Sequence, residues 1–129
     1  SLICPTIDAK KGEVFAALFK GEGNDTLRTS PDLALKPGDL IAKIKEPTLF
    51  AGDGARRYRK EIIESLGKLA IFPLPTQDDP RASQVALLGQ KQFLKRGADD
   101  IASLSPIYIR KSDAEIHLPA LSLSNHKEN

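Results

Sequence analysis

The sequence contains no methionine and no tryptophan, and Cys4 is its single cysteine among 129 residues. One cysteine cannot close a disulfide within the chain, and because Cys4 lies in an apolar run we expect a buried thiol in a cytoplasmic protein. No apolar run approaches the roughly 20 residues that span a bilayer. The start lacks the basic and apolar regions of a secretory signal. Because methionine is absent and the chain opens directly on an apolar run, we expect a piece of a longer protein.

Charge and histidine placement exclude several classes of function. The 19 basic residues are balanced by 17 acidic ones, which does not indicate a nucleic-acid binder or a protein that binds anionic membranes. His117 and His126 lack the spacing of a metal site, and no local signature of Ser/His/Asp or Cys/His catalysis is present. The length and the 40% hydrophobic content are typical of one soluble globular domain.

Two apolar runs at the start predict a β-hairpin. They cover Leu2–Ala9 and Glu13–Lys20 and flank the polar turn Lys10–Gly12. Both faces of the second run are apolar, which predicts a strand buried at the centre of a sheet. The more polar run Thr26–Ser30 predicts a third strand at an edge.

Helices and strands then alternate. A short helix carrying Leu40 and Ile44 ends before Pro47, because the residue before a proline avoids the helical region. The patterns next predict a strand at Thr48–Ala51, a helix to Leu66 and a strand at Leu69–Phe72. The last helix, Pro80–Arg96, has Asp79 as its expected N-cap. The side that we expect to face the core contains Ala82, Val85, Ala86, Gly89 and Phe93.

The order β-β-β-α-β-α-β-α predicts an α/β fold of the ribonuclease H-like type. This fold has a mixed five-stranded sheet whose later strands are joined by right-handed crossovers. Its first and fourth strands are parallel neighbours, so Asp8 and the turn Gly52–Gly54 are expected at one edge of the sheet. Ligands of open α/β sheets bind at such edges.

Two carboxylates at this edge, Asp8 and Asp53, raise the possibility of a Mg²⁺ site. Such a site needs a further carboxylate on the first helix, which offers only Asp39. We therefore expect no metal site, with Asp8 ending a strand and Asp53 capping the next helix.

The glycine turn itself is a candidate phosphate or nucleotide site, because a strand-to-helix turn exposes backbone N–H groups to an anion. An alternative is a solvated basic face beside the apolar stripe that contains Tyr58 and Ile62, and the incomplete phosphate-loop motif favours this alternative. The candidate binding residues are Gly52, Asp53, Gly54, Arg56 and Arg57.

Two further places could contact a partner. Leu87 and Leu94 lie seven residues apart, off the core side of the last helix. In the extended segment Pro106–Arg110, alternation directs Ile107 and Ile109 to the body and Tyr108 and Arg110 outward or toward a partner. From Pro119 the composition predicts a mobile tail.

Three blocks together resemble a known family. They are Ile7–Phe15 (IDAKKGEVF), Gly52–Ala55 (GDGA) and Pro106–Arg110 (PIYIR), and the last long helix also fits through Leu88 and Gly89. In this order they resemble the C-terminal half of the TsaB family, formerly YeaZ, of the glycoprotease-like group in the actin-like ATPase superfamily. Phe15 stands where the family usually has tyrosine.

The resemblance implies a ribonuclease H-like C-terminal lobe over residues 1–118, a flexible tail over 119–129 and a missing N-terminal lobe. It implies a non-catalytic scaffold in threonylcarbamoyladenosine modification of tRNA, without a cofactor or a membrane, that contacts tRNA only indirectly. Its partners would be a TsaD-like catalytic subunit and a TsaE-like ATPase, and the missing lobe would carry the main TsaD interface. The residues do not support the protease activity in the family's old label. A metal-dependent nuclease and a nucleotide-binding regulatory lobe remain alternatives.

Overall fold

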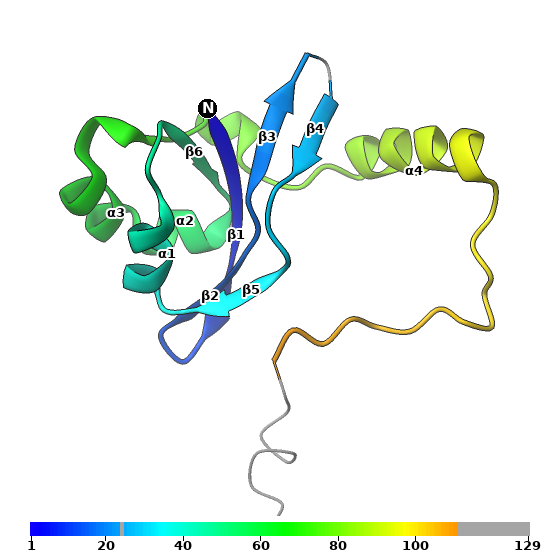
Figure 1. Ribbon diagram of the computed structural model, residues 1–129, viewed down its shortest axis with the longest axis horizontal. Coiled ribbons are helices and arrows are strands. Elements are labelled where there is room, and N and C mark those ends of the chain that lie inside the picture. The colour runs from blue at the N-terminus through cyan, green and yellow to red at the C-terminus, as the bar shows by residue number, and fades with distance from the viewer. Residues whose placement is uncertain (24, 111–129) are drawn as a thin grey trace, which may run out of the picture.

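The central strand of the sheet is β1 (Leu2–Lys10). The computed structural model describes residues 1–23 and 25–110, so the predicted tail, His117 and His126 lie outside the described residues. On one side β1 pairs antiparallel with β2 (Glu13–Ala16) and β3 (Phe19–Glu22), and on the other it pairs parallel with β6 (Thr48–Ala51) (Figure 1). The run Glu13–Lys20 lies inside the sheet as predicted, since β2 and β3 each have a neighbouring strand on both sides, but it forms two strands and not one.

This run divides at Leu18 because a neighbouring segment takes the backbone groups of that residue. The Leu18 N–H donates to Ser30 Oγ at 2.8 Å, and its carbonyl accepts from the Thr29 N–H at 2.8 Å. Residues 29–30 thus separate β4 (Asp25–Arg28), which pairs with β3, from β5 (Leu33–Leu35), which pairs with β2. The exposed edge strand expected from the third run is confirmed as β4, whereas β5 was not predicted.

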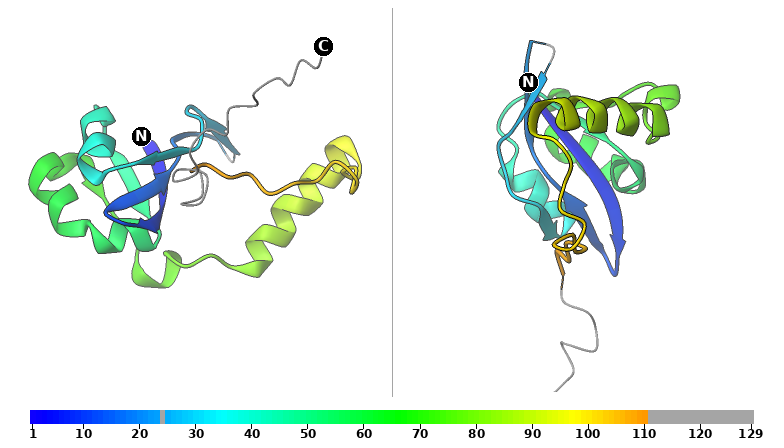
Figure 2. Two further views of the ribbon diagram at one scale, coloured as in Figure 1. Left: turned by 90° about the horizontal axis from the view of Figure 1, so that it is seen from below. Right: turned by 90° about the vertical axis from the view of Figure 1, so that its right-hand side faces the viewer.

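Three helices cover one face of the sheet: α1 (Pro37–Lys43), α2 (Asp53–Arg57) and α3 (Arg59–Leu66) (Figures 1 and 2). The single helix predicted up to Leu66 is two helices, because the backbone leaves helical geometry at Tyr58, with φ −102° and ψ 17°. Short 3₁₀ turns lie at Gly67–Leu69 and Pro75–Gln77. The core between helices and sheet consists of Cys4, Val14, Ala16, Leu40, Ile44, Phe50, Ala55 and Ile62.

The predicted parallel pairing of the first strand with Thr48–Ala51 is confirmed, with Cys4 opposite Phe50. Next to β6 lies β7 (Ala70–Ile71), also parallel. Two threonines are fully buried here and keep their hydroxyl groups bonded: Thr6 donates to the Ala51 carbonyl at 3.0 Å, and Thr48 to the Glu46 carbonyl at 2.8 Å. The central pair of strands is thus packed without an unpaired buried hydroxyl.

Within residues 1–23 and 25–110, little of the chain covers the opposite face of the sheet. Pro5, Ile7, Phe15 and Phe19 line a shallow apolar groove there, and the side chain of Ile7 is 60% exposed. We call this surface the open sheet face. Ile109, near the end of the described chain, also lines it.

Helix α4 (Ala82–Arg96) stands apart from the sheet and its covering helices (Figures 1 and 2). None of its residues is buried, so the predicted core side is wrong: no described element covers it. Its N-cap is Arg81, without a side-chain hydrogen bond, because Asp79 pairs with Arg56 instead. Gly97 ends the helix as predicted. Within the described part of the chain, every helix is too short or too polar to cross a membrane.

Candidate functional site

The ends of β1 and β6 bring Asp8 and Asp53 together, as the topology predicted. The backbone N–H of Asp8 donates to Asp53 Oδ1 at 3.1 Å. Asp53 is the first residue of α2, so its carboxylate links the start of this helix to the end of β1.

The carboxylate of Asp8 is surrounded by donors from its own chain. Oδ1 accepts from the Lys10 N–H at 3.0 Å, and Oδ2 accepts from Lys10 Nζ at 2.9 Å and from Arg57 Nη1 at 3.2 Å. The hydrogen bonds from Lys10 are the main cause that lowers the pKa of Asp8, and the charge of Arg57 adds to it. The side chain is only 6% exposed. Two cations therefore already neutralise this carboxylate.

The hydrogen bonds from Lys10 to Asp8 also stabilise the hairpin turn, which the sequence did not show. Lys10 and Lys11 have φ values of 61° and 52°, in the left-handed region that side chains other than glycine disfavour. The bonds from Lys10 to Asp8 hold the hairpin turn in this conformation. In residues 1–23 and 25–110, no three His, Cys, Asp or Glu side chains form a group that could hold a metal ion.

The two glycines of the turn are required by packing. Gly52 has φ 96°, and a Cβ at this position would overlap the carbonyl oxygen of Thr6. A Cβ on Gly54 would lie 3.0 Å from the carbonyl carbon of Ile7. The glycines thus let the start of α2 lie directly against the backbone of β1, independent of any ligand.

A carboxylate of the chain itself occupies the anion position at this turn. Asp78 Oδ1 accepts from the Gly52 N–H at 2.6 Å, and Oδ2 accepts from Arg56 Nη1 at 2.7 Å. Arg56 Nη1 also bonds to Asp79 Oδ1 at 3.0 Å, and these acidic partners raise the pKa of Arg56. The Asp78 side chain is 8% exposed. Sequence reasoning missed Asp78 because it lies 26 residues after Gly52 in a loop without a motif.

The other arginines near the turn also have partners within the chain. Arg57 pairs with Asp8, and the guanidinium of Arg59 lies 3.9 Å from the centre of the Phe72 ring. The candidate residues Gly52–Arg57 are therefore brought together, but the Gly52 N–H and the charges of Arg56 and Arg57 are used by internal contacts.

The segment 106–110 reaches the open sheet face through its last two residues. Arg110 Nη1 bonds to Glu13 Oε2 at 2.9 Å, and its guanidinium lies 5.9 Å from the centre of the Phe15 ring. Ile109 is 38% exposed, while Ile107 and Tyr108 are each 83% exposed. The outward position of Tyr108 is confirmed. The inward position of Ile107 and the outward position of Arg110 are wrong, because the segment forms no strand and does not alternate.

The other candidate partner residues, Leu87 and Leu94, project from α4 and are 53% and 78% exposed. They lie on a different face from Phe93, about a third of a turn around the helix.

Comparison with known proteins gives matches to longer proteins, while no family model matches the sequence. The chain is 30% identical over 117 residues to the tRNA threonylcarbamoyladenosine biosynthesis protein TsaB of Bacillus subtilis (strain 168), covering 88% of this chain and 49% of that protein. Its structure resembles a crystal structure of an uncharacterized protein with similarity to peptidase YeaZ from Pseudomonas aeruginosa. The TM-score is 0.60 at 18% identity, over 84% of this chain and 49% of that one.

The structural match supports only the fold, because its sequence identity is 18%. The similarity to TsaB is supported by the sequence match. The blocks that carried the resemblance lie in the hairpin of β1 and β2, in the Gly52 turn and in the segment 106–110. The chain spans about half the length of both matched proteins. Over this length the chain is similar to about half of TsaB.

Proposed function

We propose that this chain forms a ribonuclease H-like lobe of a TsaB-like protein and acts in threonylcarbamoyladenosine biosynthesis as a non-catalytic subunit. The identity with TsaB supports the process. The strand pairings support the lobe, because β2 and β3 can be counted as one interrupted strand, as can β4 and β5. The order across the sheet is then third, second, first, fourth and fifth, with the last three parallel.

The main support for the non-catalytic role is that the Asp8 carboxylate is already paired with Lys10 and Arg57. A metal-dependent nuclease needs carboxylates free to bind the ion, whereas Asp8 bonds to Lys10 and Arg57. A nucleotide at the glycine turn would have to displace Asp78 from the Gly52 N–H and Arg56. Both alternatives therefore require the chain to give up contacts that hold its turns.

As a subunit, the chain would serve in the cytoplasm beside a TsaD-like catalytic protein and a TsaE-like ATPase, contacting tRNA only through them. Because it corresponds to about half of TsaB, we expect this half alone to bind a TsaD-like protein weakly. Calorimetry with the 129-residue chain and with a full-length TsaB tests this point. Equal affinities would contradict it.

The function is tested with a chimera in which this chain replaces the aligned half of Bacillus subtilis TsaB. Mass spectrometry of tRNA nucleosides would measure threonylcarbamoyladenosine made with the other components of the pathway. We expect the chimera to support synthesis, and its Asp53→Asn variant to support it equally. If a folded chimera supports no synthesis, the proposed role in threonylcarbamoyladenosine biosynthesis is wrong. If a folded Asp53→Asn variant loses only the chemical step, the proposed non-catalytic role is wrong.

A further inference from the structure

Strand β4 lies at the end of the sheet order. Among the described strands it pairs with β3 alone, so its second edge has no neighbouring strand. All four residues of β4 are exposed. An edge of this kind presents backbone N–H and C=O groups that can pair with a further extended chain. We call the side of Asp25–Arg28 that faces away from β3 the β4 edge.

The pairing of β3 with β4 determines which backbone groups point to this edge. At the end of the pair Thr29 lies opposite Leu18, and its N–H donates to the Leu18 carbonyl at 2.8 Å. In an antiparallel pair, residues that exchange such bonds alternate with residues whose N–H and C=O groups point away from the partner strand. Leu27 therefore bonds to β3, whereas Thr26 and Arg28 direct their backbone groups to the β4 edge.

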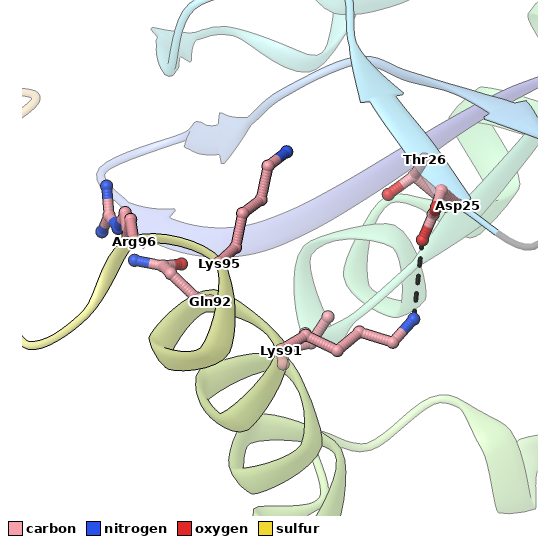
Figure 3. A pocket seen from close by; sticks show the side chains of 7 residues that line it. Asp25, Thr26, Lys91, Gln92, Lys95 and Arg96 are labelled. Atoms are coloured by element: carbon pink, nitrogen blue, oxygen red, sulfur yellow. Dashed lines mark ion pairs between the residues drawn. The ribbon is translucent and has the colours of Figure 1, made fainter.

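Helix α4 forms the other wall of a cleft that begins at β4 (Figure 3). The cleft has a volume of about 870 Å³, within the range of roughly 300–1,000 Å³ that is usual for ligand sites. Its lining includes Asp25 and Thr26 of β4 and Lys91, Gln92, Lys95 and Arg96 of α4. An extended peptide can add to a sheet edge through main-chain hydrogen bonds while a neighbouring surface holds its alternate side chains. Here α4 provides that surface.

The α4 wall of the cleft is basic. The helix contains Lys91, Lys95 and Arg96 and no acidic residue, while the charges of the β3–β4 hairpin balance one another. Arg96 pairs with Asp99 at 3.1 Å, but Lys95 forms no ion pair within the described part of the chain. A peptide with acidic side chains is therefore complementary to this wall, and a basic peptide is not.

The ion pair across the cleft shows where a carboxylate can bind. Lys91 Nζ lies 3.5 Å from Asp25 Oδ1, so this lysine reaches from α4 to the end of β4 (Figure 3). The two side chains are 69% and 83% exposed. An exposed pair contributes little to stability, because water and salt screen it. A carboxylate of a bound peptide can thus replace Asp25 as the partner of Lys91 at small cost.

We propose that the cleft between β4 and α4 binds an acidic, extended segment of a partner protein, which adds to the sheet as a strand beside β4. The backbone of the segment bonds to Thr26 and Arg28, and its carboxylates bond to Lys91 and Lys95. The site uses none of the residues around Asp8 and the Gly52 turn, so it does not depend on the proposed role in tRNA modification.

Fluorescence anisotropy of the full 129-residue chain with a labelled hexapeptide of alternating glutamate and valine tests the charge complementarity. We expect saturable binding that weakens as the salt concentration rises. A lysine–valine peptide of the same length should not bind. Lys95→Glu should raise the dissociation constant at least about tenfold. Lys68→Glu, the same change in the exposed turn after α3, is the control and should leave it unchanged. Absence of binding of the glutamate–valine peptide at millimolar concentration overturns the proposal.

Thr26→Pro separates strand addition from simple attraction between charges. Because the Thr26 N–H points away from β3, proline removes a donor of the β4 edge without removing a bond to β3. We expect this variant to stay folded by circular dichroism and to lose peptide binding, whereas Thr26→Ala keeps the N–H and should bind like the wild type. If folded Thr26→Pro binds equally well, strand addition is wrong. Tighter binding of a labelled oligouridylate than of the peptide, with the same dependence on Lys95, also overturns the proposal in favour of a surface for RNA.

Amide hydrogen exchange of the wild-type chain is a second measurement that does not depend on the folding of Thr26→Pro. The bound peptide should slow exchange at Thr26 and Arg28, whose N–H groups point to the β4 edge. Exchange at Leu27, which already bonds to β3, should change less. Unchanged exchange at both Thr26 and Arg28 with saturating peptide overturns the proposal.

Discussion

The carbonyl oxygen of Thr6 occupies the place where a side chain at Gly52 would begin. This close approach joins the two parallel strands β1 and β6 at the edge where α2 starts. Thr6 reinforces it through the hydrogen bond from its hydroxyl to the carbonyl of Ala51. The glycine turn, which resembles a phosphate-binding feature in the sequence, is here a packing device.

The first prediction concerns Gly52→Ala. The added Cβ would meet the Thr6 carbonyl and impose a side chain on a backbone with φ 96°. We expect the free energy of unfolding to fall by about 3 kcal/mol or more, measured by urea denaturation. Gly21→Ala is the control, because a Cβ at Gly21 meets no atom within 4 Å, and it should change stability by less than about 0.5 kcal/mol. Equal effects would contradict the packing role.

The second prediction separates the two acidic residues of the loop before α4. Asp78→Ala leaves the Gly52 N–H and Arg56 without their partner and should cost about 1–3 kcal/mol. Asp79→Ala removes a carboxylate whose side chain is 73% exposed and should cost less than about 1 kcal/mol. Thermal or chemical unfolding of both variants measures the difference. A larger loss of stability in the Asp79 variant would show that Asp78 is not the residue that holds the Gly52 turn and Arg56.

The third prediction is a pH dependence. The pKa of Asp8 is lowered in the folded chain, chiefly by hydrogen bonds from Lys10. A carboxyl group whose pKa falls on folding stabilises the protein above its unfolded pKa, about 3.9, and this contribution is lost as the pH falls through the folded pKa. Asp8→Asn should therefore lower the melting temperature at pH 7, and this effect should shrink progressively as the pH falls below about 4 toward the folded pKa. Asp39→Asn, an exposed carboxylate in the first turn of α1, serves as the control. If the difference in melting temperature between the wild type and Asp8→Asn stays constant with pH, the stabilising role of the ionised Asp8 carboxylate is refuted.

The fourth prediction concerns the single thiol. Burial raises the pKa of Cys4 to about 12. At pH 8 the native chain should react with a thiol reagent on the order of a thousandfold more slowly than the unfolded chain, since the thiolate is the reactive form. The rate of labelling with and without denaturant measures this. Fast labelling of the native chain would mean that β1 opens readily.

The fifth prediction uses two isoleucines of one segment. Ile109→Ala should destabilise the chain by about 1 kcal/mol, because Ile109 lines the open sheet face. Ile107→Ala should have an effect below about 0.5 kcal/mol, because Ile107 is 83% exposed. Slower amide exchange at Ile109 than at Ile107 would independently support the contact of Ile109 with the open sheet face. Faster exchange at Ile109 than at Ile107 would contradict this contact.

Local patterns were sufficient to predict several elements. The strand Thr48–Ala51 was predicted with its observed bounds, because a short apolar run before a glycine has few other conformations. The convergence of Asp8 and Asp53 followed from topology, since parallel strands end at the same edge of a sheet. The resemblance to TsaB rested on short blocks at the hairpin, the glycine turn and residues 106–110, and the comparison with known proteins confirmed it.

Only the tertiary structure could decide which contacts those elements make. The sequence could not show that Asp78 occupies the Gly52 turn, because a loop residue finds its partner only when the chain brings distant backbone groups together. It could not show that Leu18 bonds to residues 29–30 and divides a continuous apolar run into β2 and β3. Periodicity correctly gave α4 an apolar face, but it indicates which residues share a side and carries no information about what covers them.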